Sequence, residues 1–205
     1  MTPYHWIALV AAGAGLSACS ETERSDEVLF SVAVTDLPAT INNKLAQGHG
    51  LEDTLELRLR GEVFDPPHIS EIVAHGTVDR STALSASDAD LWAFKTFNQA
   101  WIIETFAASD TAEIRDFLSD PNVRAGSRAL YQRIERQDVF AVAEYQADSS
   151  DYRLVFLNHY EEPRRGKANV YVLEHGEWKR TNRLSRDSTL WLALLAFRRG
   201  SVTQR

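Results

Sequence analysis

The hydrophobic period of the chain changes from that of helices to that of strands near Asp138, and this change restricts the fold more than any other feature. Before Asp138, apolar residues recur at three- and four-residue steps, as on the buried face of a helix. After it, apolar and polar residues alternate in four short segments separated by turns, residues 139–146, 152–160, 168–174 and 177–184. Such segments form an antiparallel meander. The sequence therefore predicts an α+β fold in which helices pack on a curved antiparallel sheet.

Caps and prolines divide the helical part of the sequence into separate segments. Ser87, Asp88 and Asp90 would place a cap and negative charge at the start of the first helix. The expected helices cover residues 88–106, residues 114–118 after a capping pattern at Asp110 and Glu113, residues 122–135 after Asp120-Pro121, and the C-terminal residues 187–200.

Additional strands are expected before the helices. Residues 28–34 are rich in apolar and β-branched residues, and residues 54–63 alternate between leucines and charged residues, which is typical of a half-buried strand. Asp65-Pro66-Pro67 should end that strand, because two prolines cannot serve a central ladder. Residues 68–78 suggest another extended stretch, and residues 39–53 a helical turn.

The only cysteine of the chain lies at the end of an apolar N-terminal run, residues 6–18. This run is shorter than the roughly 20 helical residues that cross a bilayer, and it is typical of the apolar part of an export signal. Leu16-Ser17-Ala18-Cys19 resembles the lipobox of bacterial lipoproteins, in which the cysteine is acylated and becomes the new N-terminus. The resemblance implies a signal peptide over residues 1–18, a lipidated Cys19 that begins a polar tether over residues 19–27, and one domain over residues 28–205.

The same resemblance implies a location in the bacterial cell envelope, anchored in the membrane through Cys19 and facing the periplasm. Ser20, rather than an aspartate, after the cysteine implies the outer membrane. The alternative is that Cys19 is a free thiol in an uncleaved anchor or in a buried helix. The charged residues that follow it favour the lipidated form, since they cannot continue a buried helix.

The charge balance excludes one class of partner. The chain has 29 acidic and 22 basic residues, a formal net charge of −7. Nucleic-acid binding depends on neutralising phosphates with Lys and Arg, so no nucleic-acid partner is expected. With Cys19 lipidated, no cysteine remains for a disulfide, and stability must come from the core.

Helices that precede an antiparallel meander, with a terminal hairpin at Gly176-Glu177-Trp178-Lys179, resemble the nuclear-transport-factor-2-like (cystatin-like) fold. The resemblance covers residues 86–184 and implies a cone whose sheet wraps a helix and often leaves a pocket. The strands before residue 80 and the helix after residue 187 are additions to that pattern. Members of the family include enzymes, binding domains and scaffolds, so the resemblance does not choose a function.

Motifs for catalysis and for cofactors are missing from the sequence. It contains no G-x-S-x-G elbow, Walker loop or G-x-G-x-x-G, and its six histidines show no H-E-x-x-H pattern. We therefore expect no catalytic residue, no metal and no cofactor, although an enzyme assembled from distant residues stays open. His159 and Glu174 each lie in a group of histidine and carboxylates. They could approach one another if their strands pair, the alternative being two solvated turns.

The aromatic residues are the candidates for a binding site, because aromatic walls offer flat apolar surfaces with a hydrogen-bonding edge. The candidate pocket residues are Trp92, Phe97, Trp101, Tyr145, Phe156 and Trp178. The alternative is that these side chains only pack the core. The basic run Arg164-Arg165-Gly166-Lys167 is either a solvated turn or a contact for anionic lipid headgroups.

These observations favour binding over catalysis. The first hypothesis is a non-catalytic partner-binding or scaffold module that contacts another envelope protein. The second is a pocket protein for a small apolar ligand. A pocket protein should enclose a cavity between residues 88–106 and the meander, whereas a scaffold should fill that space and expose an apolar patch.

Overall fold

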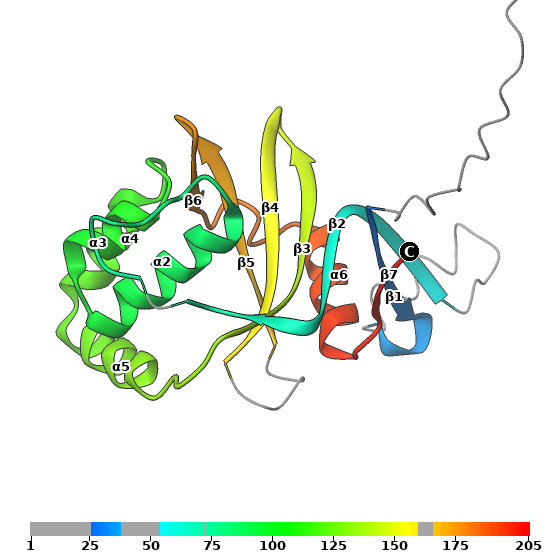
Figure 1. Cartoon of the computed structure of the whole chain (residues 1–205), viewed down its shortest axis with the longest axis horizontal. Coiled ribbons are helices and arrows are strands. Elements are labelled where there is room, and N and C mark those ends of the chain that lie inside the picture. The colour runs from blue at the N-terminus through cyan, green and yellow to red at the C-terminus, as the bar shows by residue number, and fades with distance from the viewer. Residues whose placement is uncertain (1–25, 38–53, 72, 160–165) are drawn as a thin grey trace, which may run out of the picture.

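Figure 1 shows the computed structural model of the chain, which describes residues 26–37, 54–71, 73–159 and 166–205. Seven strands form one antiparallel sheet in the order β6-β5-β4-β3-β2-β1-β7. The strands are β1 (Glu27–Ala33), β2 (Thr54–Ile69), β3 (Asp138–Ala147), β4 (Ser150–Asn158), β5 (Lys167–Glu174), β6 (Glu177–Arg180) and β7 (Val202–Gln204). The helices are the short 3-10 helix η1 (Val34–Asp36), α2 (Ala83–Thr96), α3 (Gln99–Thr105), α4 (Thr111–Ser119), α5 (Pro121–Gln132) and α6 (Ser188–Arg198). The predicted α+β fold with a curved antiparallel sheet is confirmed.

The meander β3 to β6 follows from the turns between its strands. Asp148 and Ser149 join β3 to β4, and His175 and Gly176 join β5 to β6, all four with positive φ. Two-residue turns of this kind match the twist of paired strands. The last strand ends at Arg180, earlier than the predicted residue 184, because the chain turns away at residues 183–186.

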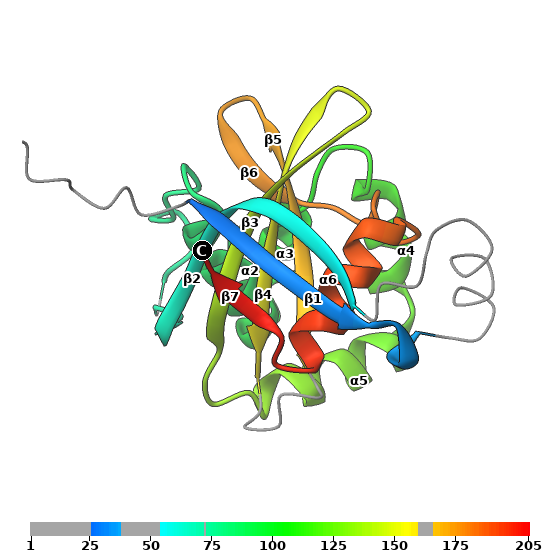
Figure 2. The ribbon, with the colours of Figure 1, turned by 90° about the vertical axis from the view of Figure 1, so that its right-hand side faces the viewer.

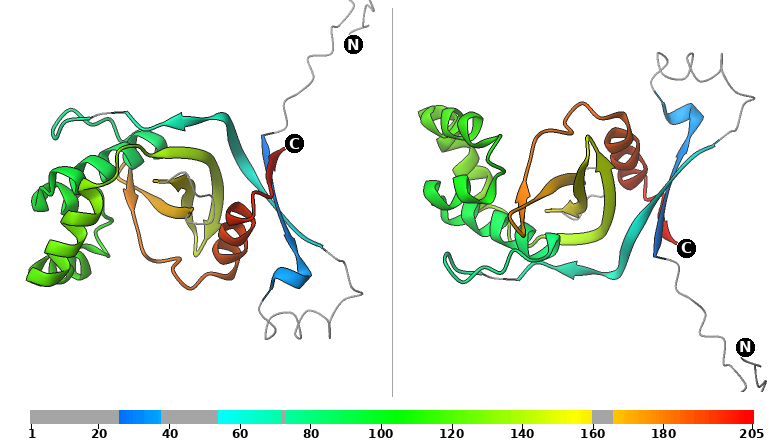
Figure 3. Two further views of the ribbon diagram at one scale, coloured as in Figure 1. Left: turned by 90° about the horizontal axis from the view of Figure 1, so that it is seen from below. Right: turned by 90° about the horizontal axis from the view of Figure 1, so that it is seen from above.

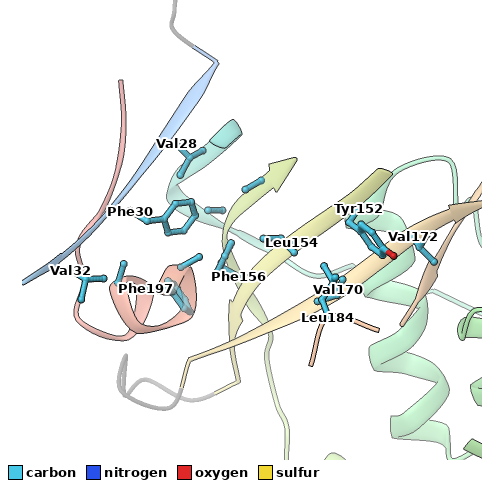
Figure 4. Packing of buried hydrophobic residues seen from close by; sticks show 14 of the residues in the cluster. Val28, Phe30, Val32, Tyr152, Leu154, Phe156, Val170, Val172, Leu184 and Phe197 are labelled. Atoms are coloured by element: carbon cyan, nitrogen blue, oxygen red, sulfur yellow. The ribbon is translucent and has the colours of Figure 1, made fainter. Parts of the chain in front are cut away.

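The sheet bends around α6 (Figure 3). This helix lies between β1 and the meander, and it closes the largest apolar core of the molecule. Phe156 of β4 is central to that core, with ring centroids 4.9 Å from Phe30 of β1 and 5.6 Å from Phe197 of α6 (Figure 4). The short strand β7, which the sequence did not predict, then pairs with β1 (Figure 2). The N-terminal strands and the C-terminal helix are therefore parts of one sheet and one core.

Strand β2 continues through Asp65, Pro66 and Pro67, so the prediction that these prolines end the strand is wrong. The register between β2 and β3 shifts between Val63 and His68, and the prolines lie in this irregular section. A proline that lies where the ladder is interrupted removes no ladder hydrogen bond, which is why the strand tolerates it. The extended stretch predicted over residues 68–78 ends at Ile69.

The single helix predicted over residues 88–106 is two helices, α2 and α3, and α2 begins at Ala83. Thr82 caps α2 in a capping box with Ser85. The break falls at Phe97, which has a left-handed φ of 54°, and at Asn98, whose side chain caps α3. The three residues predicted as the helix start therefore lie inside α2, where all three are buried: Ser87, Asp88 and Asp90.

Helices α2 to α5 cover the face of the meander opposite α6 (Figure 1). Alternate residues of β5 point to each side: Val170 and Val172 pack into the α6 core, and Tyr171 packs against the first turn of α2. In the part of the chain that the structure describes, no helix combines the length and apolarity needed to cross a membrane. Cys19 and residues 39–53 lie outside the described residues.

Candidate functional site

A buried ion pair joins α2 to β6 on the helix-covered face of the sheet. The Nη1 atom of Arg180 donates a hydrogen bond of 2.7 Å to Oδ2 of Asp90, whose side chain is only 3% exposed. Two neutral side chains lie at the same carboxylate, because Thr105 Oγ1 is 3.4 Å and Asn169 Nδ2 is 3.5 Å from its oxygens. The guanidinium also lies over the ring of Phe106, 5.2 Å from its centroid. The negative charge of Asp90 is thus compensated by Arg180, and its carboxylate oxygens have polar partners.

The electrostatics of this pair keep Arg180 charged. Burial disfavours the guanidinium, but the Asp90 carboxylate and the hydroxyls of Tyr131 and Tyr171 outweigh burial and raise the pKa of Arg180. Tyr171 lies opposite Arg180 in the sheet register. Burial first, and then the negative charge of Asp90, raise the pKa of Tyr171, which therefore stays protonated.

A second polar group is organised by Gln137, just before β3. Its Nε2 donates to Ser70 Oγ at 2.7 Å and to Ser87 Oγ at 3.1 Å. With its amide nitrogen so used, Gln137 presents Oε1 to His159 Nε2 at 2.7 Å. This arrangement places the imidazole proton on Nε2 of His159.

His159 is neutral in the folded protein. Burial, followed by the positive charges of Lys167, Arg180 and Lys95, lowers the pKa of His159 to about 3. Nearby Asp88, on α2, has a buried Oδ1 atom that accepts no hydrogen bond from the described residues. Burial raises the pKa of Asp88, against the Ser70 hydroxyl and the Glu71 backbone, which lower it.

Lys167 begins β5 and lies beside these groups. Its Nζ atom is 5.6 Å from the ring centroid of Tyr131, a residue of α5. The same ring stacks on Phe94 at 4.5 Å and meets the edge of His159 at 6.2 Å. Burial, then the charge of Arg180, lowers the pKa of Lys167 to about 8, and Asp90 opposes this change. Among the described residues, no oxygen accepts a hydrogen bond from Nζ of Lys167.

We call these residues the polar cluster: Ser87, Asp90, Tyr131, Gln137, His159, Lys167, Asn169, Tyr171 and Arg180. They come from α2, α5, β5, β6 and the segments that flank the meander. The cluster has two cations, one anion and a neutral imidazole. Such a set can hold a polar ligand and exchange a proton with it through an amine of lowered pKa.

The aromatic residues predicted to share a pocket are divided among three apolar clusters. Trp92, Phe97 and Trp101 pack among α2, α3 and α4. Tyr145 and Phe156 pack around α6, where the Tyr145 hydroxyl donates to Asp187 at 3.0 Å. Trp178 packs against the start of α2, beside a surface pocket of about 320 Å³. The structure does not bring these six side chains together.

The surface pocket at Trp178 lies between the N-terminus of α2 and the meander. Arg153 stacks on the Trp178 ring, 4.8 Å from its centroid, and pairs with Glu144 at 2.9 Å. Both charged side chains line the pocket with Phe64. Because Arg153 already has Glu144 as its carboxylate partner, its guanidinium offers a ligand no unneutralised charge.

His159 and Glu174 do not meet, although β4 and β5 pair as the hypothesis required. The register sets Leu157 opposite Lys167 and Tyr152 opposite Val172, so the two groups lie at opposite ends of the hairpin. Glu174 instead accepts from the Ala108 backbone at 2.9 Å. Of the predicted basic run, Lys167 belongs to the polar cluster, whereas Arg164 and Arg165 lie outside the described residues.

The sequence contained two signals for the polar cluster. Lys167, Asn169 and Tyr171 alternate with small and branched apolar residues along β5, which shows that a polar stripe occupies one face of a strand buried on both faces. The second signal is that Ser87 and Asp90 lie three residues apart among the alanines of α2, and so on one face of that helix. Within the described residues, no three or more His, Cys, Asp or Glu side chains are grouped to hold a metal ion.

Comparisons with protein-family models, with curated proteins and with solved structures find no match to this chain.

One consequence of the cluster is a specific pH dependence of stability. Because the pKa of His159 falls from 6.5 to about 3 on folding, protonation favours the unfolded chain. The contribution of His159 to stability is complete above pH 6.5 and decreases as the pH falls toward 3. We expect His159→Gln to show a shallower loss of unfolding free energy over this range than the wild type, measured by urea denaturation. Parallel curves for the two proteins would contradict the buried neutral imidazole.

Proposed function

We propose that the protein is a lipid-anchored protein of the bacterial cell envelope whose domain binds a small polar ligand at the polar cluster. The observation that carries the proposal is Lys167, a partly buried ammonium without an acceptor among the described residues, set beside the Arg180–Asp90 pair and the neutral His159. An unpaired charge near a protein interior is costly. A cluster whose only purpose was to join α2 to the sheet would need no such charge.

The distribution of exposed apolar residues supports ligand binding over a scaffold. The large apolar side chains with the highest exposure lie on four different elements: Ile69 on β2, Phe117 on α4, Leu130 on α5 and Leu173 on β5. Single exposed apolar residues are ordinary features of a surface. Docking of another envelope protein is a second candidate, favoured by Phe117 and Leu130 on the neighbouring outer helices.

The arrangement of the fold suits an anchor at Cys19. The chain enters the fold at Glu27, at the end of the molecule opposite helices α2 to α5 (Figures 1 and 3). An anchor on that side would hold the polar cluster away from the bilayer. We expect an alkyne-tagged fatty acid fed to cells to label the wild type but not Cys19→Ala. Equal labelling of both proteins, or of neither, would contradict the anchor.

Native mass spectrometry of the whole protein, purified from membranes in a mild detergent, tests ligand binding. We expect the wild type to retain a reproducible small mass that His159→Leu loses. His175→Asn is the matched control, because His175 lies in an exposed turn at the far end of the meander. A wild-type protein without any added mass, together with capture of one envelope protein by crosslinkers placed at Phe117 and Leu130, would favour the partner-binding alternative.

A further inference from the structure

We propose that the ligand of the polar cluster presents an anionic oxygen group, a carboxylate or a phosphate, to the ammonium of Lys167. This inference rests on the proposed ligand binding and specifies the chemistry of the group that is bound. It follows from the partners of each charge around His159.

Each other cation near His159 has a partner of its own. Arg180 pairs with Asp90 at 2.7 Å. Lys95 donates a hydrogen bond to the backbone carbonyl of Ile134 and lies over the ring of Trp92. Within the described residues, Lys167 has the face of Tyr131 as its partner and no carboxylate or carbonyl oxygen. Since Asp90 is engaged by Arg180, the described part of the cluster leaves one positive charge uncompensated.

The surroundings of Lys167 favour an anion over other ligands. The Tyr131 ring lies beneath the ammonium, and cation–π attraction compensates its charge only in part. Three positive charges act on His159, which would repel a metal ion or an ammonium ligand. Asn169 lies two residues from Lys167 on the same face of β5, and its amide, 3.5 Å from both the Asp90 carboxylate and the Tyr171 hydroxyl, makes this face of the strand polar. A carboxylate or phosphate would supply the missing negative charge and accept hydrogen bonds.

Binding of an anion should be linked to the protonation of Lys167. A negative charge beside the ammonium favours its charged form and so raises the pKa of Lys167 from about 8. Anion binding should therefore weaken above pH 8, where free Lys167 loses its proton. Two of the groups that face this position do not titrate near pH 8, because His159 is neutral and Tyr171 protonated there.

Equilibrium titration of the whole detergent-purified protein tests the proposal. The probes are inorganic phosphate and benzoate, with benzamide as the neutral analogue of benzoate and sodium chloride at matched ionic strength as a blank. We expect one of the two anions to bind. If that anion is benzoate, benzamide should bind at least about tenfold more weakly than benzoate. Lys167→Met should reduce the affinity for the bound anion about tenfold or more. Lys167→Arg should retain binding and lose its weakening above pH 8, since arginine stays protonated.

Lys179→Met is the matched control, because Lys179 is a partly buried lysine of β6 that is already paired with Glu177. Circular dichroism establishes that each variant is folded before it is titrated. Binding that is equal in the wild type and Lys167→Met would overturn the role of Lys167. A retained mass in native spectrometry that is neutral and competes with neither probe would overturn the anion while leaving ligand binding intact. A protein that retains no added mass and binds neither phosphate nor benzoate would overturn both the proposed ligand binding and the proposed anionic group.

Discussion

Gly61→Ala should prevent β2 from pairing with β3 and lower the free energy of unfolding by more than about 4 kcal/mol. Gly61 lies directly opposite Ala143 in the ladder between these strands. A Cβ atom at Gly61 would stand 2.1 Å from the carbonyl oxygen of Val142 and 2.8 Å from Cα of Ala143. Both are backbone atoms, so no side chain can rotate to make room. The φ of 157° adds a conformation that other residues rarely adopt.

The effect should be large because β2 connects the two halves of the sheet. The strand pairs with β1 on one side and β3 on the other, and the backbone nitrogen of Gly61 also donates to the carbonyl of Asp26 at 2.6 Å. Urea denaturation followed by circular dichroism measures the loss. Gly126→Ala is the control, since a Cβ there meets open space on α5 and alanine favours helix by about 1 kcal/mol. Similar stabilities of Gly61→Ala and the wild type would contradict the close approach of the two strands.

The elements that were predicted from the sequence depend on local chemistry. Strands β3 to β6 have alternating residues, and two-residue turns join β3 to β4 and β5 to β6. Both features are formed by residues that are neighbours in the sequence. The start of α2 shows where local chemistry is ambiguous. Ser87, Asp88 and Asp90 have the composition of a helix cap, and so do Thr82 and Ser85, which are the residues that form it. Only the packing of α2 against the sheet distinguishes the two sites.

The polar cluster could not be predicted in the same way, because its contacts join distant parts of the chain. Asp90 and Arg180 are separated by ninety residues, and Gln137 joins Ser70 to His159 across different elements. The periodicity places each side chain on a face of its own helix or strand. It does not show which faces meet, and the six predicted aromatic residues illustrate the consequence, since they pack in three separate clusters.

Variants of the ion pair between Asp90 and Arg180 can distinguish its role in attaching α2 to the sheet from its role in ligand binding. Arg180→Met would leave the carboxylate of Asp90 buried without its cation, and Asp90→Leu would leave the guanidinium without its anion. Breaking a buried pair on one side costs about 3–5 kcal/mol, and we expect values near the lower limit because the Arg180 side chain is 20% exposed. Urea denaturation of each single variant measures this loss.

The double variant Asp90→Leu/Arg180→Met should recover most of the stability that either single variant loses. Apolar side chains of similar size in place of both charges leave neither member of the pair as an unpaired buried ion, and such replacements are often neutral or stabilising. We nevertheless expect the recovered double variant to lose the mass that the wild type retains in native mass spectrometry. Without the pair, the amide of Asn169 loses the Asp90 carboxylate that lies 3.5 Å from it, and the position beside Lys167 loses a polar contact that orients this amide. A stable double variant that still held the ligand would show that the pair only attaches α2 to the sheet.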